Sequence, residues 1–268
     1  MKHAAIYFLL SVVITFSSCE KVIDLKLNEA EKKYVIEGTI TDQRGGCRVL
    51  ISQTKNFNED NSFESISGAA VSITDGDNNT MFLPEVSPGV YEDKQVRGVP
   101  GKTYTMHVAV NGTTFNALCA MPSRVNMDSL YVTDDFLFGE IRKVPNIDFR
   151  DPKGKGNNYR FVLYVNGVKK KNIYIINDDY ADGNSSSVKL FFFGEDDDDD
   201  KKIKSGDKIS IDMLCISPEI YKYWYSLDAG ATGNNNSASP ANPVSNISGG
   251  ALGYFSAHTV QSRLADVP

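Results

Sequence analysis

The chain has 268 residues, of which 41% are hydrophobic and 10% aromatic, so it can bury sizeable cores and is not disordered throughout. Its formal net charge is −6, and its short basic run, Lys169–Lys171, is offset by the acidic run Glu195–Asp200. Nucleic-acid binding needs clustered Lys and Arg, so no nucleic-acid partner is expected. The length allows two ordinary domains or one large one.

The first 24 residues have the pattern of an exported protein. Lys2 supplies a positive start, Ala4–Phe16 is a mostly apolar run, and two serines precede Cys19. This order predicts a lipoprotein signal peptide over residues 1–18, with Cys19 acylated as the first residue of the mature protein. A transmembrane anchor would need roughly 17–25 apolar residues, and this run stops short. The remaining alternative is a soluble secreted protein cleaved near Cys19, which leaves the cysteine unexplained.

Residues 19–33 are charged and weakly patterned, which predicts a tether between the membrane and the first domain. The next segments are short, rich in β-branched and aromatic residues, and separated by turn formers, a pattern typical of strands. We expect strands at Tyr34–Thr41, Cys47–Gln53, Ala70–Thr74, Met81–Leu83 and Val90–Asp93, with turns at Asp75–Asn79 and Pro84–Gly89.

The clearest local signal is Thr103–Ala120, in which an Asn-Gly dipeptide joins two alternating runs and so predicts a type I′ hairpin. A two-residue turn places six residues on one apolar face, in the opposed pairs Val108–Phe115, Met106–Ala117 and Tyr104–Cys119. We therefore expect Cys119 in the core and His107 on the outer face beside Asn116. The short strands and frequent turns predict an antiparallel, immunoglobulin-like or transthyretin-like sandwich over residues 34–121.

Met121–Asp128 has a proline and little periodicity, and is the expected boundary before a second β-rich domain at residues 127–262. This domain is expected to be a sandwich or barrel-like. We expect its strands at Tyr159–Val165, Ile173–Ile176, Val188–Phe193, Lys208–Ile216 and Leu252–Val260, with long polar loops between them. Alternation of apolar and polar residues within Lys208–Ile216 predicts that Cys215 faces the core.

One helix is expected at about residues 218–228, because Ser217 is a good N-cap and Pro218 suits the first helical position. Helical spacing gives the helix one apolar face, made of Ile220, Tyr223, Trp224 and Leu227. Tyr221 and Tyr225 are then left for the surface, where they are candidate ligand-contact aromatics. The alternative is that the aromatic cluster serves only the core.

Few residues of the mature chain suit catalysis or metal binding. His107 and His258 are its only histidines, so a histidine-based catalytic or zinc site would need the two domains to meet. Asp75–Asn79 begins like a calcium loop but lacks the later Gly and Glu of an EF-hand, so a hairpin turn is favoured. The acidic run Glu195–Asp200 is typical of a solvated loop. We expect no catalytic residues, no metal site and no cofactor.

If Cys19 is acylated, Cys47, Cys119 and Cys215 remain. An exported compartment permits one disulfide, but an odd number of cysteines without metal-type spacing indicates no particular pair. Free thiols buried in the cores are the alternative.

Seven segments, taken in order, resemble a known family. They are SCEKVIDL around Cys19, YVIEGTIT at Tyr34–Thr41, ISGAAVSITDGDN at Ile66–Asn78, PGVY at Pro88–Tyr91, GKTYTMHV at Gly101–Val108, SPEIYKYWYSL at Ser217–Leu227 and SNISGGALGYFSA at Ser245–Ala257. The set spans nearly the whole mature chain and resembles the Bacteroidota outer-membrane lipoprotein family known as domain of unknown function 4249. The acidic run Glu195–Asp200 departs from the family as a local elaboration.

The resemblance implies an outer-membrane lipoprotein, held by acyl chains such as palmitate and exposed at the cell surface. Because the family is similar in genomic setting to accessory lipoproteins beside TonB-dependent transporters, it also implies a transporter as partner and a part in uptake. It carries no catalytic residues over to this chain. The triplet Asp128-Ser129-Leu130 resembles the O-glycosylation acceptor pattern of that phylum, so Ser129 is a candidate O-glycan site; a plain linker is the alternative.

Three functions are compatible with these patterns. The first is a non-catalytic binding or accessory lipoprotein of a TonB-dependent uptake system. The second is a surface adhesin or glycan-binding structural module that uses sandwich loops and Tyr221 or Tyr225. The third, ranked last, is a carboxylate-based hydrolase, which needs two carboxyl groups about 5–9.5 Å apart.

Overall fold

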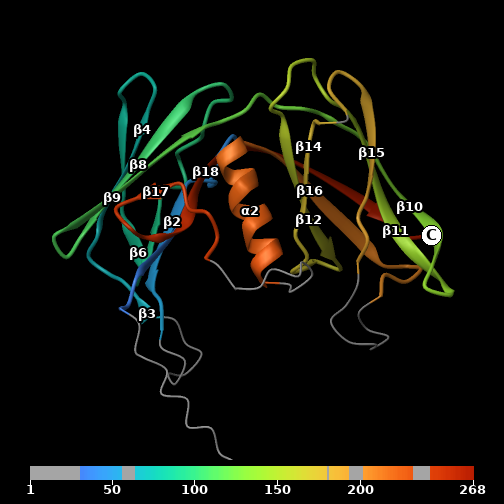
Figure 1. Ribbon diagram of the computed structural model, residues 1–268, viewed down its shortest axis with the longest axis horizontal. Coiled ribbons are helices and arrows are strands. Elements are labelled where there is room, and N and C mark those ends of the chain that lie inside the picture. Colours follow the sequence, from blue (N-terminus) through green and yellow to red (C-terminus); the bar gives the residue numbers. More distant parts are fainter. Residues whose placement is uncertain (1–30, 56–63, 180, 193–201, 232–241) are drawn as a thin grey trace, which may run out of the picture. The chain divides into compact units, whose positions relative to one another are not determined.

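The computed structural model describes residues 31–55, 64–179, 181–192, 202–231 and 242–268 (Figure 1). Cys19, the predicted signal peptide and the acidic run Glu195–Asp200 lie outside these residues. From Lys32 onward the described residues belong to one compact unit, which contains three sheets and the helix α2. The predicted mainly β class is confirmed.

The largest sheet has ten strands in the order β13-β12-β16-β18-β1-β2-β7-β6, with β14 also pairing with β12 and β3 with β2. Its strands are β1 Tyr34–Thr41, β2 Arg48–Gln53, β3 Glu64–Ser65, β6 Glu85–Ser87, β7 Val90–Glu92, β12 Asn158–Val165, β13 Val168–Lys169, β14 Tyr174–Asn177, β16 Lys208–Ile216 and β18 Leu252–Asp266. Among the described strands β13 and β6 end the sheet without pairing to each other, so it is open and the barrel-like alternative does not hold. A short strand, β6, lies inside the predicted turn Pro84–Gly89, where Glu85 and Ser87 pair with β7.

The second sheet has five strands in the order β17-β9-β8-β4-β5. Its strands are β4 Ala70–Asp75, β5 Thr80–Leu83, β8 Thr103–Val110, β9 Thr113–Ala120 and β17 Ile247–Ser248. The predicted hairpin register is confirmed, because Val108–Phe115, Met106–Ala117 and Tyr104–Cys119 are opposed and all six residues are buried. His107 points to the other face, with its Nδ1 atom 2.7 Å from Oδ1 of Asn116.

The third sheet contains β10 Met127–Leu137, β11 Glu140–Arg150 and β15 Ser185–Lys189, in that order. The sequence pattern did not predict the long β10–β11 hairpin, because charged residues interrupt its apolar alternation and Pro145 stands inside β11. Its turn uses Phe138 and Gly139 at φ values of 51° and 86° rather than an Asn-Gly pair. β15 begins three residues before the predicted Val188, since its serines pair with β11.

Two hydrophobic cores fill the space between the sheets, one around Phe255 and the other around Phe161. β18 contributes to both cores: residues 252–258 pair with β1 in parallel, and residues 259–266 pair with β16 in antiparallel orientation. The closing strand is therefore longer than the predicted Leu252–Val260. The domain bounds 34–121 and 127–262 stay a prediction, with β18 shared by the two parts.

β18 and β1 approach each other closely at Gly253, which lies opposite Ile36 in the parallel ladder. Gly253 has a φ of +96°, and a Cβ atom at this position would lie 2.0 Å from the carbonyl oxygen of Ile36. Both the left-handed backbone and the short approach require glycine, so this residue fixes the pairing of the first and last described strands.

Helix α2, Pro218–Ala231, begins where predicted and ends three residues beyond the expected position 228. The carbonyl of buried Ser217 accepts the first helical hydrogen bond, from the N–H of Tyr221 at 3.0 Å. Tyr223 is buried and Trp224 packs against the first core, as helical spacing predicts. α2 contacts β12, β14 and β18 (Figure 1). Within the described residues, no helical segment combines the length and apolarity needed to cross a membrane.

Candidate functional site

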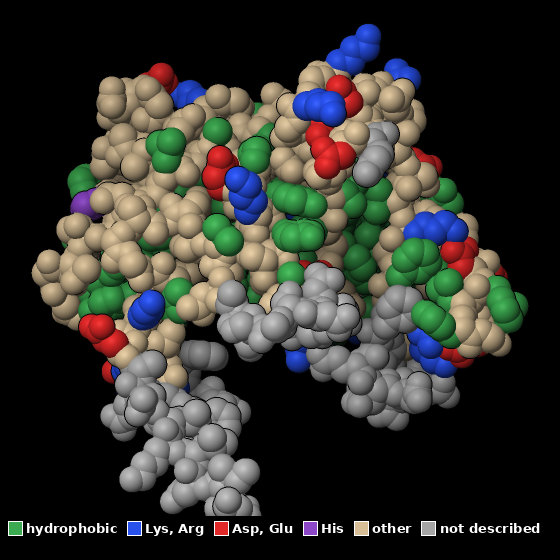
Figure 2. All heavy atoms as spheres, in the orientation of Figure 1, with side chains coloured by type: hydrophobic (Ala, Val, Ile, Leu, Met, Phe, Trp, Pro, Cys, Tyr) green, Lys and Arg blue, Asp and Glu red, His purple; other side chains and the backbone are tan. Residues whose placement is uncertain are grey.

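A pocket of about 310 Å³ lies where α2 meets β14 and β15. α2 supplies Tyr221, Tyr225 and Asp228, while the strands and their flanks supply mostly aliphatic side chains together with Tyr174. Figure 2 shows hydrophobic side chains gathered beside α2 and over β14 on this face. The pocket therefore has one aromatic wall from the helix and one largely aliphatic wall from the strand edges.

The helical wall is built by residues that helical periodicity places on one stripe. Tyr221 and Tyr225 are four residues apart, and their rings stack with centroids 6.1 Å apart and planes 21° apart. Tyr225 is 56% exposed, whereas Tyr221 is half-buried and burial raises the pKa of its hydroxyl. Asp228 follows on the same stripe, and burial raises the pKa of its carboxyl. The wall thus contains two stacked rings and the side chain of Asp228.

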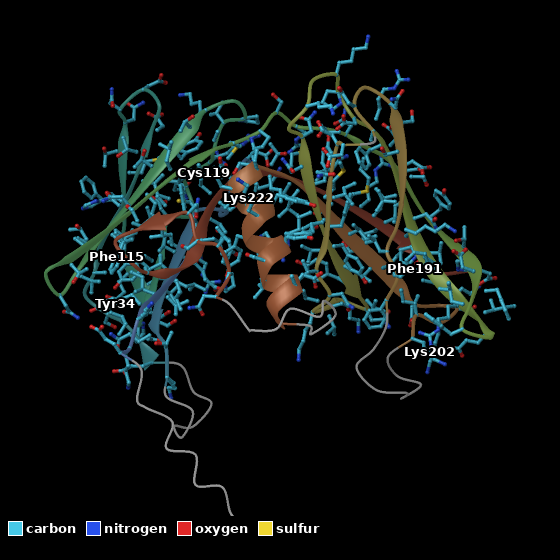
Figure 3. All side chains as sticks on the ribbon, viewed as in Figure 1. Tyr34, Phe115, Cys119, Phe191, Lys202 and Lys222 are labelled. Carbon is cyan, nitrogen blue, oxygen red and sulfur yellow. The ribbon has the colours of Figure 1, made fainter. Side chains whose placement is uncertain are left out.

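The opposite wall is held in place by a hydrogen bond across the two strands. The hydroxyl of Tyr174 donates to the carbonyl oxygen of Phe191 at 3.0 Å, which ties β14 to the residues after β15. Figure 3 shows Phe191 at the lower end of β15. Burial raises the pKa of Tyr174, so this hydroxyl stays protonated and keeps its donor role. Lys189, also in the lining, pairs with Asp135 at 2.5 Å, and its charge is therefore engaged outside the pocket.

This arrangement suits binding through ring faces and apolar contacts. Pockets for small ligands usually measure about 300–1,000 Å³, so the observed volume of about 310 Å³ fits one ring-sized group. Tyrosine combines an apolar ring face with a hydroxyl that hydrogen bonds, which suits ligands that are apolar on one face and polar at the edge. A sugar ring has this character.

The chain was also compared with known proteins. The profile of the family described as Domain of unknown function (DUF4249) matches residues 20–263. The chain belongs to this family. No curated protein matches it. Among solved structures, the crystal structure of chicken CNTN1 FN1-FN3 domains is similar at 10% sequence identity and a TM-score of 0.25, and the match covers 68% of this chain and 60% of that one.

In this DUF4249 protein, Tyr221 and Tyr225 both line the pocket. Only Tyr225 is exposed as predicted, because Tyr221 is half-buried and also packs against the first core. Their contact with a ligand stays a prediction. Sequence reasoning missed Tyr174 and Asp228. Asp228 shares the helical stripe of the two tyrosines, so periodicity alone could have found it, whereas the place of Tyr174 depends on how β14 packs.

Ser129, the candidate O-glycan site, lies within β10 rather than in a linker. Its hydroxyl donates a hydrogen bond to Oδ2 of Asp148 on β11 at 2.7 Å. The same bond is the main reason that the pKa of Asp148 is lowered. Glycosylation of Ser129 stays a prediction, and it would require this hydrogen bond to be given up.

The Asp75–Asn79 segment of the DUF4249 chain forms a tight turn between β4 and β5. Oδ1 of Asp75 accepts hydrogen bonds from the N–H groups of Asp77 and Asn79, each at 2.9 Å. The hydrogen bond from the Asn79 side chain is the largest reason that the pKa of Asp75 falls to about 2. Lys102 also pairs with this turn. Throughout the described ranges, no group of three or more His, Cys, Asp or Glu is placed to hold a metal ion.

Cys47, Cys119 and Cys215 are buried free thiols. Cys119 faces the first core and Cys215 the second, as the strand alternation predicts. The Cys119 sulfur accepts a hydrogen bond from the N–H of Ala257 on β18 at 3.2 Å. Burial raises the pKa of all three thiols, that of Cys47 to about 12, so they remain protonated and unreactive at neutral pH.

Proposed function

We propose that this DUF4249 protein is a non-catalytic lipoprotein of the outer membrane, anchored through Cys19, that binds a ligand for a TonB-dependent uptake system. The anchor is supported by the apolar run that ends in two serines and Cys19. The uptake role is supported by the resemblance to lipoproteins that accompany such transporters. The transporter is then the protein partner, and the membrane holds the protein through its acyl chains.

The observation that carries the binding role is the pocket between α2 and the β14 and β15 edges. The pocket is preformed, because the helix holds the Tyr221–Tyr225 stack and a hydrogen bond to the Phe191 carbonyl oxygen holds Tyr174. A preformed pocket spends little free energy on ordering side chains when a ligand enters. We take a sugar ring as the ligand class that this wall fits best.

A second candidate, a surface adhesin or glycan-binding module, is favoured by the same stacked pair, since Tyr225 is largely exposed. In that role the protein would hold glycans of a host or matrix rather than pass them to a transporter. A hydrolase ranks below both candidates, because the described lining of the pocket has one carboxyl group, Asp228, where glycoside hydrolysis commonly uses two.

Co-purification from the native outer membrane tests the uptake role. A tag at the C-terminus of the chain is expected to retain a TonB-dependent transporter after solubilisation in a gentle detergent, detected by mass spectrometry. A tagged lipoprotein of the same membrane that is unrelated to uptake serves as the control and should not enrich the transporter. If this protein elutes without a transporter at every gentle condition tried, the accessory role is wrong, while glycan binding is unaffected.

A further inference from the structure

Arg160 lies in the middle of β12, on the face of the large sheet against which α2 packs. Its guanidinium carbon is 3.5 Å from the centroid of the Trp224 ring on α2. Tyr223 and Tyr254 pack around the same indole, with ring centroids 5.4 and 5.3 Å from it. The cation therefore sits over an aromatic platform that holds its position.

This guanidinium has no acceptor in the described part of the protein. Its Nε atom is shielded from solvent without a hydrogen-bond partner, and no other buried side-chain nitrogen or oxygen of the described residues is in that state. Arg48, Arg124 and Arg142 each pair with a carboxylate, whereas no described Asp or Glu forms an ion pair with Arg160. The Nη atoms of Arg160 form no hydrogen bond to a described acceptor either.

An unpaired, partly buried cation destabilises a fold unless another group compensates its charge. Burial is the largest effect on the pKa of Arg160 and lowers it, whereas the hydroxyls of three tyrosines act in the opposite direction. A cation–π contact offsets part of the cost of desolvation but provides no acceptor for the N–H groups. The planar guanidinium fork matches the two oxygens of a carboxylate or phosphate.

A second cation, Lys169 on β13, lies on the same face of the sheet, because it pairs with Tyr164 of β12 and strand alternation places Tyr164 and Arg160 on one face. The pKa of Lys169 on β13 is lowered, mainly by burial and next by the charge of Arg160. Glu37 and Asp212 act on Lys169 in the opposite direction, yet neither pairs with Arg160. Asp212 instead accepts a hydrogen bond from the Ser262 hydroxyl at 2.5 Å. Two cations on one sheet face that form no ion pair with a described carboxylate are the arrangement that an incoming anion completes.

We propose that Arg160, with Lys169 beside it and the Trp224 ring beneath it, binds the carboxylate or phosphate group of a small ligand. This anion site is separate from the α2 pocket, because none of its three residues lines that pocket. The proposed anion site does not depend on the proposed uptake role. A bound anion would lie beside α2, next to the side of the helix that carries Tyr221 and Tyr225.

Trp224 is the only tryptophan of the chain, so its fluorescence reports on this site alone. The purified mature chain in detergent is titrated with sodium phosphate and, separately, with sodium acetate, at constant ionic strength set with sodium chloride. We expect a saturable change in emission with at least one anion, and at least tenfold weaker binding by Arg160→Met. Arg263→Met is the matched control, since β18 alternation places Arg263 on the opposite face and its loss should leave binding unchanged.

The absence of a saturable response to both anions in the wild-type chain would overturn the proposal, and so would equal affinities of wild type and Arg160→Met. A response to phosphate alone, or to acetate alone, identifies which oxygen group the site takes. If circular dichroism shows that the methionine variant is unfolded, Arg160→Lys replaces it. That variant keeps the charge but loses the fork, so the same weakening is expected. The bound anion should also raise the Tm of the wild type but not of the Arg160 variant.

Discussion

Replacing Cys19 with alanine is expected to remove the protein from the outer-membrane fraction. Cys19 is the residue to which the predicted lipoprotein signal directs acylation. Each buried methylene of an acyl chain contributes about 0.8 kcal/mol to membrane binding. Loss of all chains therefore changes the distribution from almost wholly membrane-bound to almost wholly absent from that membrane. Fractionation with immunoblotting measures this, and mass spectrometry of the N-terminal peptide measures the acyl chains.

Cys47→Ala is the matched control for this experiment. The Cys47 thiol is buried in the first core, so its removal is expected to leave the proposed anchor, and therefore the membrane fraction of the protein, unchanged. Retention of Cys19→Ala in the outer membrane, at the level of the wild type, would make the lipoprotein interpretation wrong. The protein would then have to be held there by a partner or by another part of its surface.

Acidification from pH 7 to pH 4 should destabilise the wild type by about 3 kcal/mol more than His258→Gln. His258 lies in β18, is 6% exposed, and has its Nδ1 atom 2.8 Å from the Ser256 hydroxyl. Burial, followed by the charge of Arg160, lowers its pKa from 6.5 to about 4. The unfolded chain thus takes up a proton below pH 6.5, while the folded chain takes it up only near pH 4. The neutral imidazole of His258 therefore costs the folded chain no stability above pH 6.5. As the pH falls from 6.5 towards 4, the free energy of unfolding decreases, because only the unfolded chain gains a proton.

Urea unfolding at pH 7 and pH 4 measures the two free energies of unfolding for each variant. Acidic groups also titrate in this range, so the prediction concerns the difference between wild type and His258→Gln. His107→Gln is the control, because His107 is exposed on the outer face of β8, beside Asn116. Equal pH dependence of the wild type and His258→Gln would contradict the assignment of a buried neutral imidazole.

Local sequence signals predicted the elements whose formation depends on neighbouring residues. The Asn-Gly turn set the register of β8 and β9, and the residues at the start of α2 set its first turn. β1 has the bounds expected from its β-branched run. In each case a local pattern of a few residues (a turn, a helix start or a β-branched run) decides the structure, so it is readable without knowledge of the fold.

The parts that were not predicted depend on contacts between distant segments. The β10–β11 hairpin carries charged residues on both faces, and only its pairing with β15 reveals the third sheet. β18 extends to Asp266 because β16 pairs with its second half, although Arg263 and Asp266 interrupt the apolar alternation. Tertiary pairing overrides local β-propensity at such positions.

The candidate site was predicted in part for the same reason. Helical periodicity placed Tyr221 and Tyr225 on one exposed stripe, but the facing wall exists only because β14 and β15 lie next to α2. In the sequence, Arg160 is a charged residue within a strand pattern, and nothing local distinguishes it from an ordinary surface arginine. Its contact with Trp224, 64 positions further along the chain, follows from the packing of α2 on the sheet.

The central claim is that the Tyr221–Tyr225 wall of the α2 pocket holds the ligand, and binding to an array of glycans tests it most directly. The wild-type chain is compared with the double variant Tyr221→Ala, Tyr225→Ala, and with Tyr131→Ala, which removes a partly exposed tyrosine of β10. Stacking on an aromatic ring contributes on the order of 1–3 kcal/mol in cases where it has been measured on nucleic-acid bases. We therefore expect at least tenfold weaker glycan binding by the double variant and unchanged binding by Tyr131→Ala. Glycan binding that is the same in the double variant as in the wild type would contradict the claim.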